Sequence, residues 1–144
     1  MWKLYNCLLV FILVLSINIY AATDNAEAKV SKSVVSTGEI FTYTLKIEGQ
    51  VRSPKIELPE FENFTIASQS QQRQYTSKNN GTNLTLQITY NLFAPNPGNF
   101  VIKGASLTDK GKRIETQPIA IEVTGKPLEE KLRAAPSLEK GIDI

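Results

Sequence analysis

Histidine is absent from this 144-residue sequence, and cysteine and tryptophan occur once each. Without histidine the chain lacks the commonest general base, the usual metal ligand and the centre of Ser-His and Cys-His catalytic arrangements. A single cysteine, Cys7, excludes a disulfide within the chain and a cysteine-based metal cluster. These absences disfavour an enzyme, a cofactor and a metal site, and leave open only a hydrolase built on paired carboxylates.

The chain also has little excess charge of either sign. Its formal net charge is +2, and lysines and arginines are interleaved with acidic residues along the sequence. Nucleic-acid-binding proteins gather their cations on one face, because phosphate neutralisation supplies most of the affinity. We therefore expect no nucleic-acid partner. The length predicts one domain with a sizeable core.

The first residues have the features of an export signal. Lys3 precedes an almost wholly apolar run, Cys7–Ile17, and small residues follow at Ala21 and Ala22. We predict a signal peptide at residues 1–21. Cleavage after Ala28 is the second candidate site, and an uncleaved membrane anchor is disfavoured because the run is shorter than the ~20 residues that span a bilayer.

Alternating apolar and polar residues dominate the rest of the chain. In Leu84–Phe93 and in Phe41–Glu48 every second residue is apolar, which is the period of a half-buried strand. The predicted strands cover residues 30–35, 41–48, 55–58, 65–77, 84–93, 99–107 and 113–124. Their number and spacing predict an all-β, immunoglobulin-like β-sandwich of about seven antiparallel strands over residues 29–124. Phe61 and Phe64 are expected to plug one end of its core, and Pro118 to mark a bulge or a switch between sheets.

One predicted strand is unusually polar. Thr65–Ser77 is rich in serine and glutamine, so it buries little and belongs at a sheet edge, next to a hairpin turn at residues 78–81. An unpaired edge can accept an extended segment of another protein. The residues expected to contact such a partner are Gln69, Gln71, Arg73 and Tyr75. A solvated edge with no partner explains the same composition equally well.

Two further segments bear on function. Glu57, Glu60 and Glu62 could suggest a calcium loop, but apolar residues and a proline interrupt the acids, so no metal is expected. Residues 125–144 are predicted to be a linker tail. Two helical turns after Pro127 are the alternative, disfavoured because only Leu128 and Leu132 share a face.

Several fragments together resemble the N-terminal domain of the BatD family, bacterial envelope proteins associated with aerotolerance gene clusters. The fragments are VSKSVVSTGEIFTYTL at 30–45, LPEFENF at 58–64, SQS at 68–70, YNLFAPNPGNFVI at 90–102 and GKRIETQPIAIEV at 111–123. Their order and spacing cover nearly all of residues 29–124. Lys103 departs from the pattern, which has a proline after the Phe-x-Ile strand.

The resemblance implies a non-enzymatic scaffold in an envelope stress complex, located in the periplasm or cell envelope. Family members are described as encoded beside MoxR-type ATPases and von Willebrand factor A proteins, so the latter are candidate partners. Members carry a C-terminal membrane anchor that these residues lack, so membrane contact is expected only through an uncleaved signal or through that missing anchor. The alternative is a surface adhesin or carbohydrate-binding β-sandwich, although the only tryptophan, Trp2, lies in the signal.

Overall fold

The computed structural model describes residues 25–50, 54–78 and 81–135, so the predicted signal peptide lies outside the described residues. This part of the chain forms ten strands and one helix. The strands are β1 (Asn25–Val30), β2 (Val34–Ser36), β3 (Phe41–Gly49), β4 (Lys55–Glu57), β5 (Thr65–Lys78), β6 (Gly81–Phe93), β7 (Gly98–Ile102), β8 (Ser106–Asp109), β9 (Lys112–Glu115) and β10 (Ile119–Thr124), and the helix is α2 (Leu128–Ala134).

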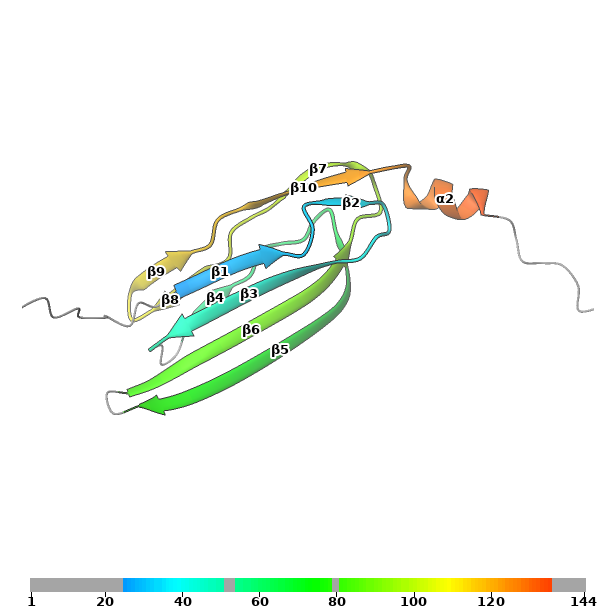
Figure 1. Cartoon of the computed structure of the whole chain (residues 1–144). Coiled ribbons are helices and arrows are strands. Elements are labelled where there is room, and N and C mark those ends of the chain that lie inside the picture. Colours follow the sequence, from blue (N-terminus) through cyan, green and yellow to red (C-terminus); the bar gives the residue numbers. More distant parts are fainter. Residues whose placement is uncertain (1–24, 51–53, 79–80, 136–144) are drawn as a thin grey trace, which may run out of the picture.

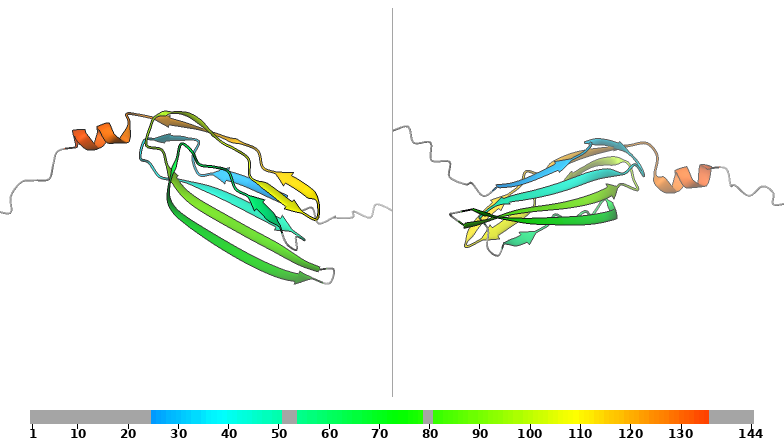
Figure 2. Two further views of the ribbon diagram at one scale, coloured as in Figure 1. Left: turned by 180° about the vertical axis from the view of Figure 1, so that it is seen from behind. Right: turned by 60° about the horizontal axis from the view of Figure 1, so that its bottom comes forward.

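The strands are arranged in two layers (Figures 1 and 2). One layer is a four-stranded sheet in the order β1-β3-β6-β5. The other contains two three-stranded sheets, β2-β10-β7 and β4-β8-β9. Buried side chains from both layers join in one hydrophobic core, which includes Leu86 from the first layer and Leu107 and Ile121 from the second. The predicted all-β, immunoglobulin-like sandwich is confirmed.

The predicted strands 99–107 and 113–124 are each interrupted, and the two interruptions lie opposite each other in the second layer. β7 and β8 follow each other along one hairpin arm, and β9 and β10 along the other. At the break the Thr116 N–H donates to the Ala105 carbonyl, and the Ala105 N–H donates to the Thr116 hydroxyl, both at 2.9 Å. A Cβ on Gly104 would lie 2.1 Å from the Thr116 carbonyl oxygen, so only glycine fits there. Pro118 lies in this break, as expected.

The first predicted strand, residues 30–35, is two strands in different layers. β1 pairs antiparallel with β3, and after Val30 the chain crosses over so that β2 pairs with β10. The second pairing is parallel, so the sheets are not wholly antiparallel. Val35 on β2 is buried opposite Val123. Cleavage after Ala28, the second candidate site, would remove most of β1.

The centre of the core is the pairing of β3 with β6. Phe41, Tyr43, Leu45 and Ile47 on β3 face the core and pair with Leu92, Tyr90, Ile88 and Leu86 on β6. All eight side chains are buried. Each contributes about 1.5–3 kcal/mol from the area it removes from water. These two strands are therefore the main source of apolar burial in the first layer.

Aromatic rings close one end of this core, as predicted for Phe61 and Phe64. Phe64 packs edge-on against Phe41 and Phe100, with ring centroids 5.4 and 5.7 Å apart. Phe61 packs against Tyr43 and Tyr90 at 5.4 and 5.0 Å. The connection after β4 is thus held to the sandwich by ring contacts.

Residues 125–135 differ from the expected solvated linker, because α2 forms and is attached to the end of the sandwich. The Leu128 N–H donates to the Pro95 carbonyl (2.8 Å), the Thr37 hydroxyl to the Lys126 carbonyl (2.5 Å), and Lys131 Nζ to the Thr37 carbonyl (3.0 Å). Leu128 is half-buried beside Gly38, whereas Leu132 is 68% exposed. These hydrogen bonds join main-chain groups, a hydroxyl and the Lys131 ammonium, and hydrophobic periodicity does not predict them.

Leu128→Ala should lower the melting temperature, because it removes the apolar contact that seats α2 against the turn at Gly38. The expected loss is about 1 kcal/mol, or roughly 4–8 °C in a domain of this size. Leu132→Ala is the matched control on the same helix and should leave the melting temperature unchanged. Equal melting temperatures for both variants and the unmodified chain would show that α2 does not contribute to the fold.

Candidate protein-binding edge

The β5 strand lies at the edge of the four-stranded sheet, as predicted, and pairs along its whole length with β6 (Figure 1). It contacts no other strand to a comparable extent. The residues from Thr65 to Ser77 are exposed on both faces, so β5 extends beyond the part of the sheet that the second layer covers. This strand is held in place by main-chain pairing with β6, and hardly by burial.

The four predicted contact residues share one face of β5. Gln69, Gln71, Arg73 and Tyr75 pair with Tyr90, Ile88, Leu86 and Leu84, whose side chains all face the core. Directly paired residues of a sheet point to the same side. The four residues therefore form a polar strip that continues the inner face of the sheet outward. They are exposed, and Tyr75 is 61% accessible.

The main-chain groups of the same four residues point to the open edge. Lys78 and Gly81 pair across a two-residue connection, and such a pair closes the turn with its own hydrogen bonds. Pairs then alternate between bonded and non-bonded along an antiparallel ladder. From Gln69 to Ser77, the main chain of even-numbered residues therefore hydrogen-bonds to β6. The N–H and C=O groups of odd-numbered residues point away from β6, toward the open edge.

The edge also has features that limit unwanted pairing. A bulge interrupts the ladder between Ile66 and Ser68, and Arg73 places a charge on the inward side of the strand. Bulges and inward charges are common protections of sheet edges against aggregation. Because no second layer covers Arg73, its guanidinium stays in water. The edge is therefore protected against stacking while its main-chain groups remain accessible.

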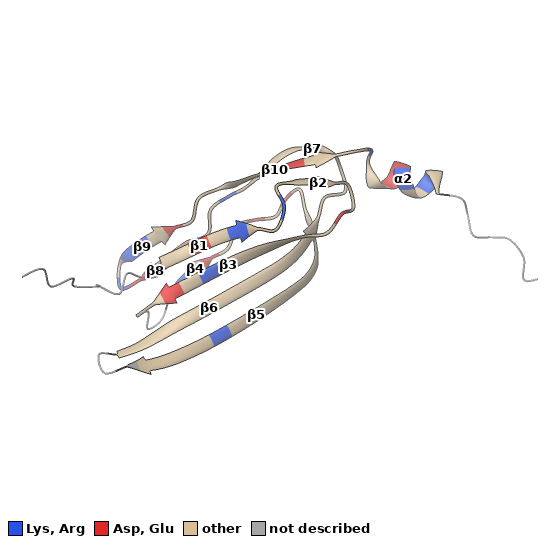
Figure 3. Cartoon of the chain, viewed as in Figure 1, with Lys and Arg blue, Asp and Glu red and all other residues tan. Residues whose placement is uncertain are grey.

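Charge is sparse on β5, where Figure 3 shows a single basic position in the middle of the strand. That position is Arg73, whose NH1 lies 3.5 Å from the Tyr75 hydroxyl. On β1 and β3 of the same sheet the cations have acidic partners: Lys29 lies 2.9 Å from Glu27, and Lys46 lies 2.7 Å from Glu48. Ion pairs this exposed contribute little to stability.

Two of the three acids of the possible calcium loop, Glu57 and Glu62, contact other side chains. Glu57 lies 3.0 Å from Lys55 Nζ and accepts a 2.9 Å hydrogen bond from the Ser106 hydroxyl. The Lys55 ammonium, followed by the Ser106 hydroxyl, lowers the pKa of the Glu57 carboxyl. Glu62 lies 3.9 Å from Lys103 Nζ. Within the described ranges no group of three acidic or cysteine side chains could hold a metal ion.

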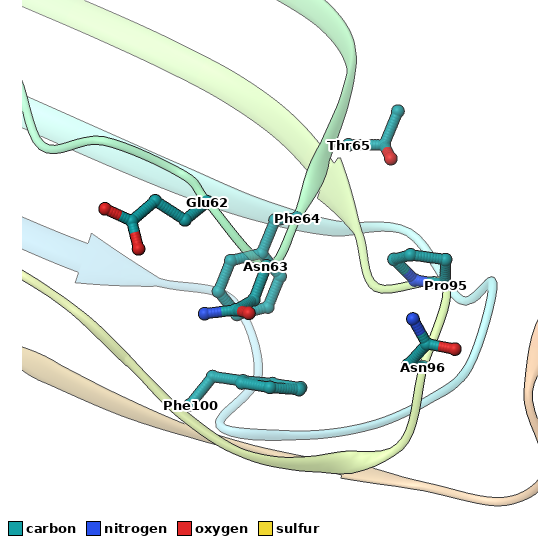
Figure 4. Close-up of a pocket in the computed structure, with 7 residues that line it drawn as sticks. All are labelled: Glu62, Asn63, Phe64, Thr65, Pro95, Asn96 and Phe100. Carbon is teal, nitrogen blue, oxygen red and sulfur yellow. The ribbon is translucent and has the colours of Figure 1, made fainter.

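Two shallow hollows flank the loop that follows β6. One, of about 140 Å³, is lined by Glu62, Asn63, Phe64, Thr65, Pro95, Asn96 and Phe100 (Figure 4). The other, of about 330 Å³, lies between this loop and the Leu128 and Leu132 side chains of α2. The first hollow has one carboxylate, Glu62, and one hydroxyl, Thr65, and Figure 4 shows these two side chains apart from each other, not arranged as a nucleophile and its base.

Tyr43 carries the one strongly shifted pKa in the described part of the chain. Its ring is fully buried, and its hydroxyl makes no hydrogen bond of normal geometry to the described residues. Burial raises the pKa of Tyr43 to about 12, and the neighbouring Tyr90 adds to the shift while the Thr116 hydroxyl opposes it. The Thr116 hydroxyl already accepts the Ala105 N–H. Tyr43 is thus a core residue, packed against Phe61 and Tyr90.

Comparison with known protein families identifies the class of this sandwich. Residues 28–123 match the family model described as the BatD DUF11 like domain. The match covers most of the chain, so the chain belongs to the BatD family. No curated protein matches it significantly. Among the described residues no helix is long and apolar enough to cross a membrane.

Proline substitutions test which main-chain groups of β5 are outward. Gln71→Pro should leave the melting temperature nearly unchanged, because the lost N–H faces the open edge. Gln72→Pro removes a ladder hydrogen bond to β6 and should cost about 1 kcal/mol or more in unfolding free energy. Thermal or urea unfolding measures both. A less stable Gln71→Pro than Gln72→Pro would reverse the assignment of the two sides.

Alkaline unfolding tests the burial of Tyr43. Its folded pKa is raised, so the unfolded chain ionises first and stability is lost as the pH rises from about 10 toward about 12. Burial also raises the pKa of Tyr90, so Tyr90 contributes to the same loss of stability at high pH. In melts from about pH 9 to about pH 11, Tyr43→Phe should reduce the decline in melting temperature. Tyr75→Phe, at an exposed tyrosine, should leave this decline unchanged. Equal declines of melting temperature with pH in both variants and the unmodified chain would contradict the burial of Tyr43.

Proposed function

We propose that this BatD-family chain is an exported, non-enzymatic interaction module of the periplasm or cell envelope. It acts as a scaffold in an envelope stress or aerotolerance complex by binding an extended segment of a protein partner along the open edge of β5. The observation that carries this proposal is the outward row of main-chain groups on Gln69, Gln71, Arg73 and Tyr75, next to an exposed polar strip.

Strand addition suits this edge for physical reasons. Main-chain hydrogen bonds to the outward residues supply affinity, and alternate side chains of the added strand meet the strip and supply specificity. The strand is long, with 14 residues, and it carries few charges that a partner would have to match. The polar side chains keep the unoccupied edge soluble.

The family supports a choice of partner. BatD proteins are described as encoded beside von Willebrand factor A proteins, which are the candidate partners for this edge. The alternative, a surface adhesin or carbohydrate-binding domain, has less support because sugar sites use exposed aromatic platforms. Tyr75 is the one exposed aromatic residue on β5.

The test is binding of a purified von Willebrand factor A protein of the kind encoded beside BatD proteins. Gln71→Pro, which removes an outward donor, should weaken binding at least about tenfold. Gln71→Ala keeps the donor and removes only the side chain, so its effect should be smaller. Equal binding by all three proteins would place the contact elsewhere, and glycan binding without protein binding would favour the adhesin.

A further inference from the structure

The β5 edge differs from the other open edges of the sandwich in length. β1, β2, β4, β7 and β9 also lie at sheet ends, and they have three to six residues. β1 additionally contacts β9 of the second layer and carries the Glu27–Lys29 ion pair. β5 has 14 residues with no acidic side chain among them. It is the edge with most unpaired main-chain groups to satisfy.

The side chains of β5 are also complementary to themselves. Glutamine amides and serine or threonine hydroxyls both donate and accept hydrogen bonds, so a strip of them can pair with an identical strip. A strip made of one charge sign could not, because like charges placed opposite each other repel. From Thr65 to Ser77 the one charged residue is Arg73, in an otherwise neutral stretch, and Lys78 ends the strand.

We propose that two copies of this chain pair their β5 strands antiparallel about a two-fold axis at Gln72. The two four-stranded sheets then become one continuous eight-stranded sheet. This inference rests on the proposed function in one respect: it assigns a second copy to the same edge that the protein partner uses. Self-pairing and partner binding are therefore competing uses of β5.

The position of the axis follows from the ladder. Outward residues are odd-numbered, so odd residues of one copy must face odd residues of the other. The regular part of β5 begins at Ser68, after the bulge. A two-fold axis at Arg73 would pair the whole regular part of β5, but it would place the arginines of the two copies directly opposite each other. An axis at Gln72 pairs residues 68–76 and sets Arg73 opposite Gln71.

This arrangement places compatible groups across the strip. Tyr75 of one copy faces Gln69 of the other, and the Arg73 guanidinium can donate to the Gln71 amide oxygen. The second layer does not cover these positions, so the added strand leaves Arg73 in contact with water. The pairing therefore carries no cost of burying an unpaired charge.

The assembly closes at two copies. The same edge is used on both sides of the axis, which is the property of an isologous interface. Once paired, neither copy has an open β5 edge left. The opposite end of the same sheet is β1, which β9 approaches from the second layer. Self-pairing thus protects the longest edge from open-ended aggregation until a partner displaces the second copy.

The experiment traps the pair with single cysteines in the full chain, in a Cys7→Ser background. Gln72→Cys places two thiols at adjacent, non-bonded positions on the axis, where a disulfide can form. Gln87→Cys is the control: Gln87 is exposed and pairs with Gln72 one strand further in. Its two copies would lie about 15 Å apart, too far for a bridge.

The proposal expects a concentration-dependent dimer by sedimentation, preferential crosslinking of Gln72→Cys over Gln87→Cys, and a dimer at least about tenfold weaker in Gln71→Pro. A monomer at all concentrations, equal crosslinking, or a dimer insensitive to Gln71→Pro would overturn it. Binding of the von Willebrand factor A protein separates this from the proposed function. A monomer whose partner binding is weakened by Gln71→Pro refutes only self-pairing, and a trapped dimer with unaltered partner binding refutes only the proposed function.

Discussion

The pairing of β3 with β6 is the contact on which the rest of this sandwich depends. It aligns two rows of buried side chains, with Leu45 opposite Ile88 at the centre, over the second layer. Burial of such rows is the dominant favourable contribution to folding. β1, β5 and the aromatic connection that contains Phe61 and Phe64 are all arranged around this pair.

The two outer strands of the sheet depend on that pair in different ways. β1 keeps half-buried residues such as Ala28 and Val30 against the core. β5 has none, because its inward side carries polar residues and no second layer lies over it. Its stability comes through the ladder with β6. The sheet therefore supports an accessible, mostly polar edge, on which Ile66 and Tyr75 are the large exposed apolar side chains.

Periodicity in the sequence predicted the sandwich, the edge position of β5 and the turns, because each depends on a local pattern of apolar residues or glycine. It missed features that depend on distant main-chain groups. No glycine or proline marks the crossover between β1 and β2, so residues 30–35 read as one strand. The α2 helix is anchored through the Thr37 and Pro95 carbonyls, which no side-chain pattern records. The polar composition of β5 predicts the exposure of Gln69, Gln71, Arg73 and Tyr75, whereas the shared outward direction of their main chain follows only from the pairing register.

Native-state hydrogen exchange on the Gln71→Pro variant, whose edge stays open, tests the central claim most directly. The account predicts that amides of β3 and β6 exchange only through global unfolding, that even-numbered amides of β5 exchange at a lower free energy, and that Gln69, Arg73 and Tyr75 are the least protected. Equal, slow exchange across β5 and β3 would mean that β5 has a covered core of its own, and would contradict the account.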